Sequence, residues 1–190
     1  GELTMLNELI GHARKTDQRE LAEQCSREAL ALIETLSLDD SVTVGTTCIN
    51  IATARYVFGE YEASLQMFER AEAVYQQHPG TDPQLMGGLY NNMALTCVSL
   101  GRFEEAFGLY QKALDVMKTV ENGELEQAIT CLNMADAVAA QDGLEAGEAR
   151  IFALLDRALA LLHDESAPHD GYYAFVCEKC APSFSRRRRN

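Results

Sequence analysis

The stretch LYNNMALTCVSLGRFEEAFGLYQKALDVM, residues 89–117, decides the fold of this chain. Its apolar residues recur at intervals of three and four on both sides of Gly101, which is the spacing of amphipathic helices. Glycine readily takes the left-handed conformation that ends a helix, so the chain can fold back at this point. The stretch therefore predicts a helical hairpin, with Tyr90 and Met93 on the packing face of its first helix and Tyr110 on that of its second.

The same pattern recurs along the chain with a period of 42 residues. The second clear copy is TCINIATARYVFGEYEASLQMFERAEAVY, residues 47–75, in which Gly59 replaces Gly101. Weaker copies lie on either side, and the four turn positions are Asp17, Gly59, Gly101 and Gly143. A fixed period of this length is typical of helical hairpins that stack side by side, each burying an apolar face against its neighbour.

At these positions the sequence resembles the tetratricopeptide repeat family. The matching residues of the third copy are Tyr90, Met93, Ala94, Cys97, Ala106, Tyr110 and Ala113, and those of the second are Cys48, Ile51, Ala52, Arg55, Ser64, Phe68 and Ala71. The period is about eight residues longer than the usual period of about 34. Together with the Asn-x-Ala motif of the first helix, this length resembles the kinesin light chain type of the repeat. The resemblance covers residues 1–165.

The resemblance implies an all-α fold, a right-handed α-solenoid of about four helical hairpins. An apolar stretch after the fourth hairpin predicts a C-terminal capping helix, and the final arginine-rich residues have no apolar period. We therefore expect one domain over residues 1–184. Its parts are hairpins at about 2–37, 43–78, 85–120 and 126–163, a capping helix at about 170–181, and a disordered basic tail at 185–190.

Composition excludes several classes of partner. The 190 residues carry a formal net charge of −13, and four of the 16 basic residues are the arginines at 186–189. Such an acidic body repels nucleic acid and anionic membranes, and the sequence has neither a membrane-spanning apolar run nor a signal peptide. We expect a soluble, cytoplasmic protein that binds neither nucleic acid nor membranes. Because the chain begins at Gly1, we also expect a tag remnant or an internal fragment of a longer protein.

We expect no enzymatic activity, no catalytic residue and no cofactor. The sequence lacks the glycine-rich phosphate loops, the serine hydrolase elbow and the zinc protease motif that carry such chemistry. Its acidic side chains fall on solvent-facing helical positions, as at Glu60, Glu62 and Glu69. The first four cysteines are expected to be buried thiols, because apolar residues surround Cys25, Cys48, Cys97 and Cys131.

One short motif has metal-like spacing. Cys177 and Cys180 form a CxxC pair, and His163 and His169 precede it. Two thiolates at this spacing can share a zinc ion that two histidines complete. Two buried thiols on one helix face would give the same pattern, and strong zinc signatures have two such pairs. We therefore assign no metal site and keep a zinc-binding module as a lesser alternative.

Three asparagines at equivalent positions give the main functional clue. Asn50, Asn92 and Asn133 each directly precede the Ile-Ala or Met-Ala pair of a first helix. In the family that the chain resembles, first helices line the concave groove in which ligands lie. An amide both donates and accepts hydrogen bonds, so this ladder could hold a peptide backbone. Alternatively, each asparagine bonds a neighbouring helix. The predicted binding residues are Asn50, Asn92, Asn133, Asn91, Thr53, Tyr56, Leu95 and Asp136.

These observations predict a scaffold for protein–protein interaction that binds a peptide or helical segment in the concave groove. Family members that grip the C-terminal carboxylate of chaperones use several basic residues in their first helices. In the first helices of the last three copies, the only basic residue is Arg55. A partner of the carboxylate-clamp type is therefore not expected. One alternative is a peptide-sensing regulatory fragment of a larger protein whose effector domain is missing. Another is a homo-oligomer formed through the terminal repeat, since terminal repeats need a polar cap.

Overall fold

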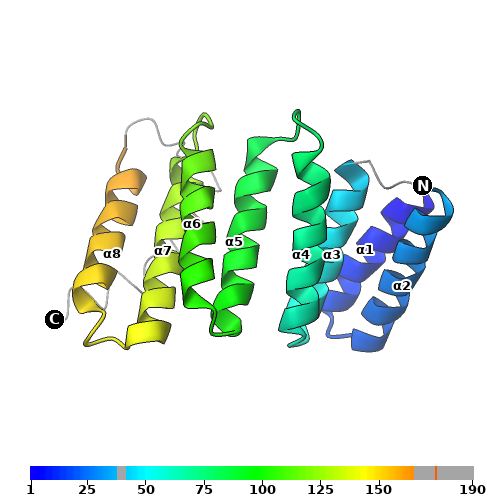
Figure 1. Ribbon diagram of the computed structural model, residues 1–190, viewed down its shortest axis with the longest axis horizontal. Helices are drawn as coiled ribbons and strands as arrows, with labels where there is room; N and C mark the ends of the chain where they lie inside the picture. The colour runs from blue at the N-terminus through cyan, green and yellow to red at the C-terminus, as the bar shows by residue number, and fades with distance from the viewer. Residues whose placement is uncertain (38–41, 165–173, 175–190) are drawn as a thin grey trace. The chain divides into compact units, whose positions relative to one another are not determined.

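The computed structural model describes residues 1–37, 42–164 and 174, and these residues form eight α-helices and no β-strand (Figure 1). In order, the helices are α1 (Glu2–Lys15), α2 (Arg19–Thr35), α3 (Val42–Val57), α4 (Tyr61–Gln76), α5 (Pro83–Ser99), α6 (Phe103–Met117), α7 (Glu124–Asp142) and α8 (Glu148–Leu162). They pack pairwise as the hairpins α1–α2, α3–α4, α5–α6 and α7–α8. The predicted all-α fold of repeated helical hairpins is confirmed. Apart from residue 174, the predicted capping helix and the basic tail lie outside the described residues.

The chain divides into two compact units, Gly1–Asp82 and Pro83–Asn190. In the first unit α3 packs against both helices of hairpin α1–α2, and in the second α7 packs against both helices of hairpin α5–α6. Each unit is thus built from two hairpins that share a core. Within residues 1–37 and 42–164, no helix combines the length and the apolar character that crossing a bilayer requires.

The first three hairpins turn through the same local structure. The backbone φ angle is positive at Asp17 (56°), Gly59 (79°) and Gly101 (73°), which are three of the four predicted turn positions. The amide one residue after each of them reaches back to a carbonyl five residues earlier, as in the bond of 2.8 Å from Arg102 N to Cys97 O. This is the bond that closes a helix C-terminus when the next residue turns left-handed. The turn positions follow from sequence because the whole motif is local.

Small residues bring the two helices of a hairpin together. The second helices bury them at two positions of the repeat, 42 residues apart in successive hairpins, where each is at most 2% exposed: Ala22, Ser64 and Ala106, then Ala29, Ala71 and Ala113. In the second hairpin the Ser64 hydroxyl donates to the Ala52 carbonyl of the facing helix at 2.7 Å. Side chains of this size let two backbones approach closely, and larger residues beside them fill the remaining space.

At the far end of two hairpins a glycine makes room for a large side chain. A Cβ atom added at Gly45 would lie 2.3 Å from Cε1 of Tyr75, and one added at Gly87 would lie 1.9 Å from Cε of Met117. Both the glycines and the large residues are 42 positions apart, so this contact repeats with the hairpin. The Tyr75 ring is rigid and 2% exposed, whereas the end of the Met117 side chain is flexible.

Gly45→Ala is therefore expected to destabilise the protein. Crowding against the Tyr75 ring should lower the free energy of unfolding by about 1–2 kcal/mol, even though alanine is the better helix former. The matched control is Gly88→Ala in α5, where a Cβ meets no heavy atom within 4 Å. That change should raise the free energy of unfolding by up to about 1 kcal/mol. Urea denaturation followed by circular dichroism measures both, and equal stability of the two variants would contradict the close packing.

Candidate functional site

The three equivalent asparagines lie on first helices: Asn50 on α3, Asn92 on α5 and Asn133 on α7. Asn50 and Asn92 are half-buried, and Asn133 is 8% exposed. Within the described residues, none of these three side chains forms a hydrogen bond. Helices α5 and α7 pack together in the second unit, so Asn92 and Asn133 lie on neighbouring helices. Asn50 offers the same group in the first unit.

Asn91, one residue before Asn92, has a different environment. Its side chain is 6% exposed, and its Nδ2 atom donates a hydrogen bond of 2.9 Å to Oγ1 of Thr130 on α7. The first unit contains the same bond, from Nδ2 of Asn7 on α1 to Oγ1 of Thr47 on α3 at 3.0 Å. The two asparagines are 84 residues apart and the two threonines 83, and each link connects the first helices of adjacent hairpins. Asn91 therefore holds helices together inside the second unit.

The sequence analysis did not predict the hydrogen bond between Asn7 and Thr47. Asn7 belongs to the weakest copy of the repeat, in which few family positions are recognisable. Asn7 and Asn91 are two repeats apart, whereas the intervening copy has Ile49 at this position. Their partners Thr47 and Thr130 are 83 residues apart, so a comparison at twice the period does not align the threonines.

The remaining predicted residues divide among the same three helices. Thr53, Leu95 and Asp136 follow Asn50, Asn92 and Asn133 by three positions, so each shares a helix face with its asparagine. Thr53 and Leu95 are half-buried, and Asp136 is exposed. The Thr53 hydroxyl also donates to the Ile49 carbonyl of its own helix at 2.7 Å.

Tyr56 contacts the beginning of the next helix. Its half-buried ring lies against that of Tyr61, the first residue of α4, with ring centroids 5.3 Å apart and planes inclined by 59°. A tilted aromatic pair of this kind stabilises the turn between α3 and α4. Tyr56 therefore contributes to the packing of the hairpin, and only part of its ring surface is accessible.

The cysteines of the described region have the character of core residues. Cys25, Cys48, Cys97 and Cys131 are all buried. Burial raises the pKa of the Cys48 and Cys131 thiols above the ordinary value, against a smaller opposing effect of Arg70 and Arg157 respectively. These thiols are therefore neutral at physiological pH and weak nucleophiles.

No metal-binding cluster was found in the residues that the structure describes. Within residues 1–37 and 42–164, no three side chains of His, Cys, Asp or Glu come together as metal ligands would. His163 directly follows α8 and is exposed. The CxxC pair Cys177 and Cys180, with His169, lies outside the described residues, so zinc binding there stays a prediction.

One hairpin of this structure matches a family model. Residues 88–124, which include most of α5 and all of α6, match the model described as tetratricopeptide repeat. This hairpin is therefore similar to a tetratricopeptide repeat. Repeats of this family typically form modules for protein–protein interaction rather than enzymes. Among curated proteins none matches the chain significantly. The likeness to the kinesin light chain type stays a prediction.

The buried thiols lead to a direct chemical test. In a Cys177→Ser, Cys180→Ser variant only the four buried cysteines remain. At pH 8 the folded variant should release almost no chromophore from a disulfide reagent within minutes, because attack needs an accessible thiolate. After denaturation in guanidinium chloride the same sample should release four equivalents. Rapid labelling of the folded protein would show that at least one of these thiols is reactive.

Proposed function

We propose that this protein is a cytoplasmic interaction module that binds an extended or helical segment of a partner protein along the first helices of its hairpins. The observation that carries the proposal is Asn133. Its amide is 8% exposed and forms no hydrogen bond within the described residues. In the described part of the chain, the asparagine oxygens that are sealed from solvent without a partner belong to Asn7 and Asn91, so the Asn133 amide keeps access to the surface and can pair with an incoming group. A peptide backbone lying on α7 would supply the missing donor and acceptor.

Asn92 extends this surface to the neighbouring helix. It lies on α5, which packs against α7, and its amide is likewise uncommitted within the described residues. The residue three positions later differs in each helix, being Leu95 in α5 and Asp136 in α7. We infer that the asparagines bind the partner's backbone, while Leu95 contacts an apolar side chain and the exposed Asp136 carboxylate attracts a basic one. The net charge of −13 favours a basic partner segment in the same way.

The proposed partner segment is internal to its chain rather than a C-terminus of the chaperone type. Among the first-helix residues 45–58, 87–100 and 128–141, only Arg55 is basic. Its Nη1 atom donates to the Ala63 carbonyl in its own hairpin at 3.4 Å. A terminal carboxylate would therefore find no guanidinium or ammonium group beside Asn92 or Asn133 on α5 and α7.

Replacing the three asparagines should abolish binding without unfolding the protein. We expect the Asn50→Ala, Asn92→Ala, Asn133→Ala variant to keep its helical circular dichroism, because these side chains form no hydrogen bond within the described residues. Proteins captured from native extract by the parent chain and identified by mass spectrometry should be lost with the variant. With the purified partner, affinity should fall by about tenfold or more, since each lost hydrogen bond contributes about 1 kcal/mol.

A matched control removes an amide from a different helix. Gln111 is an exposed residue of α6 whose side chain donates to Asp115 of the same helix. Gln111→Ala should capture the same proteins as the parent chain. Equal recovery with the triple variant would remove the asparagine surface from the binding site, and equal loss with Gln111→Ala would show that the effect is not specific to it.

A further inference from the structure

The first hairpin lacks an aromatic ring that the next two hairpins bury. Successive second helices carry Ser26, Phe68 and Tyr110 at one position of the 42-residue repeat. Phe68 and Tyr110 are 1% and 0% exposed. Ser26 is also buried, but its hydroxyl only donates to the Ala22 carbonyl of its own helix at 2.6 Å. The space that a ring fills in the other two hairpins is therefore left without a side chain here.

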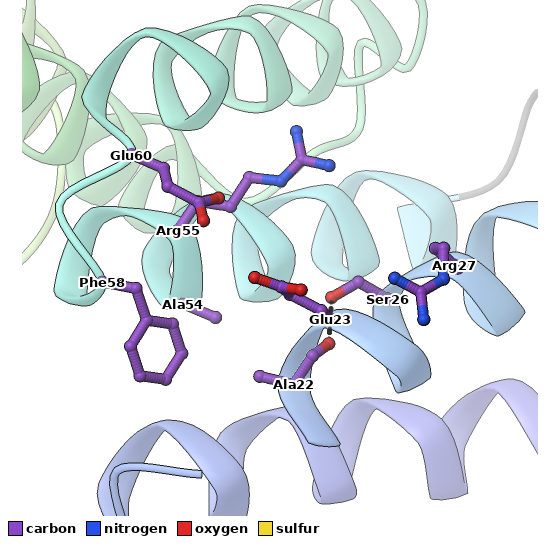
Figure 2. Close-up of a pocket in the computed structure, with 8 residues that line it drawn as sticks. All are labelled: Ala22, Glu23, Ser26, Arg27, Ala54, Arg55, Phe58 and Glu60. Carbon is purple, nitrogen blue, oxygen red and sulfur yellow. Dashed lines mark hydrogen bonds between the residues drawn. The ribbon is translucent and has the colours of Figure 1, made fainter. Parts of the chain in front are cut away.

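A pocket lies at this position. Its volume is about 240 Å³, and its walls come from α2, from α3 and from the turn before α4 (Figure 2). Small side chains leave the space open: Ala22 and Ser26 on α2 and Ala54 on α3, with Phe58 beside them. An apolar cavity of about 150 Å³ in another protein is large enough to bind benzene. This pocket therefore has room for a phenyl ring and a short polar group.

The charged residues of the pocket leave two guanidinium groups available. Its carboxylates, Glu23 and Glu60, both pair with Arg19, which lies just outside; the distance from Nε to Oε1 of Glu23 is 2.9 Å. Arg55 uses one of its five N–H groups in the bond to Ala63. Arg27 is exposed and has no hydrogen bond or ion pair with any described residue.

The apolar and cationic parts of the pocket are on different sides. Figure 2 shows Ala22, Ala54 and Phe58 together on one side. The guanidinium groups of Arg27 and Arg55 lie away from them and apart from each other, with the Glu23 carboxylate in the centre of the view. Glu23 and Glu60 carry two negative charges against three positive charges on Arg19, Arg27 and Arg55, so this group of residues has a net charge of +1. A ligand that fits both sides has an apolar ring and an anionic group attached to it.

We propose that this pocket binds an aromatic ring that carries a carboxylate a few bonds away. The ring takes the space that Phe68 and Tyr110 fill in their own hairpins, and the carboxylate pairs with Arg27, whose guanidinium has no partner among the described residues. A peptide that ends in phenylalanine and a free aromatic acid share this chemistry. The pocket is built from α2 and α3 of the first unit and uses none of the asparagines, so it is a binding site additional to the proposed function.

N-acetyl-phenylalanine is the probe that tests the proposal, with N-acetyl-phenylalaninamide as the uncharged comparison. Titration of the intact chain, followed by two-dimensional NMR, should shift the signals of Ala22, Ser26 and Ala54. The acid should bind about tenfold more tightly than the amide, because only the acid forms charge-assisted hydrogen bonds with Arg27. Acetate, which has no ring, should shift none of these signals. Equal affinities for acid and amide, or no shift with the acid, would overturn the proposal.

Two kinds of variant separate the contributions of ring and charge. Ser26→Phe supplies the ring that the second hairpin already accommodates, so it should abolish binding of the acid and leave the midpoint of thermal unfolding unchanged or higher. Ser26→Leu is the smaller filler if phenylalanine impairs folding. Arg27→Gln should reduce the affinity for the acid to that for the amide. Its matched control, Arg157→Gln, removes an exposed charge from α8. This change should alter neither the affinity for the acid nor the affinity for the amide. Unchanged binding in a folded Ser26 variant would exclude the pocket.

The source of the ligand follows from a third probe. A short peptide that ends in phenylalanine presents the same ring and carboxylate together with a backbone. Tighter binding of the peptide than of N-acetyl-phenylalanine would assign the site to a protein C-terminus. Equal binding would assign it to a free aromatic acid. Failure of both probes would overturn the proposal without affecting the asparagine surface, which the triple asparagine variant tests separately.

Discussion

The close approach of two helices within each hairpin is the contact on which the other features of this protein depend. It requires small side chains at two positions of every second helix, and alanine or serine occupies both positions in the first three hairpins. Once the backbones are this close, every neighbouring position must match the space that remains. The buried aromatic rings of Phe68 and Tyr110, and the glycines that face Tyr75 and Met117, are consequences of that constraint.

Departures from the repeat are informative for the same reason. A packed core tolerates little change in volume, so a small residue at a position that normally holds a ring leaves space rather than a rearranged helix. Ser26 is such a residue, and the pocket beside it contains both apolar and cationic side chains. The fourth hairpin departs differently, because α7 ends one residue before its turn glycine, Gly143, whereas α3 and α5 end two residues before theirs. The repeated positions thus build the helical scaffold, whereas the proposed pocket lies where the first hairpin departs from the repeat.

Two adjacent asparagines show how finely the polar groups are divided between structure and function. Asn91 and Asn92 differ by one residue, which rotates the side chain by about 100° around the helix. Asn91 points to Thr130 on the neighbouring helix and is used in packing. Asn92 points elsewhere, and its amide remains available to a partner that offers a backbone. An interaction module needs asparagines of both kinds, because the residues that bind a partner are held in position by the packing of their helices.

The hairpins and their turns could be predicted from the amino-acid sequence. Both depend on interactions within a few residues: the period of apolar side chains along a helix, and the positive φ angle at Asp17, Gly59 and Gly101. Tertiary structure alone decided which asparagines bond inside the protein, because Asn7 meets Thr47 and Asn91 meets Thr130 only after hairpins stack. It likewise decided that Ser26 borders a pocket and that Arg19 occupies both of its carboxylates. Contacts between residues some 40 positions apart depend on how whole helices pack, and no local pattern records them.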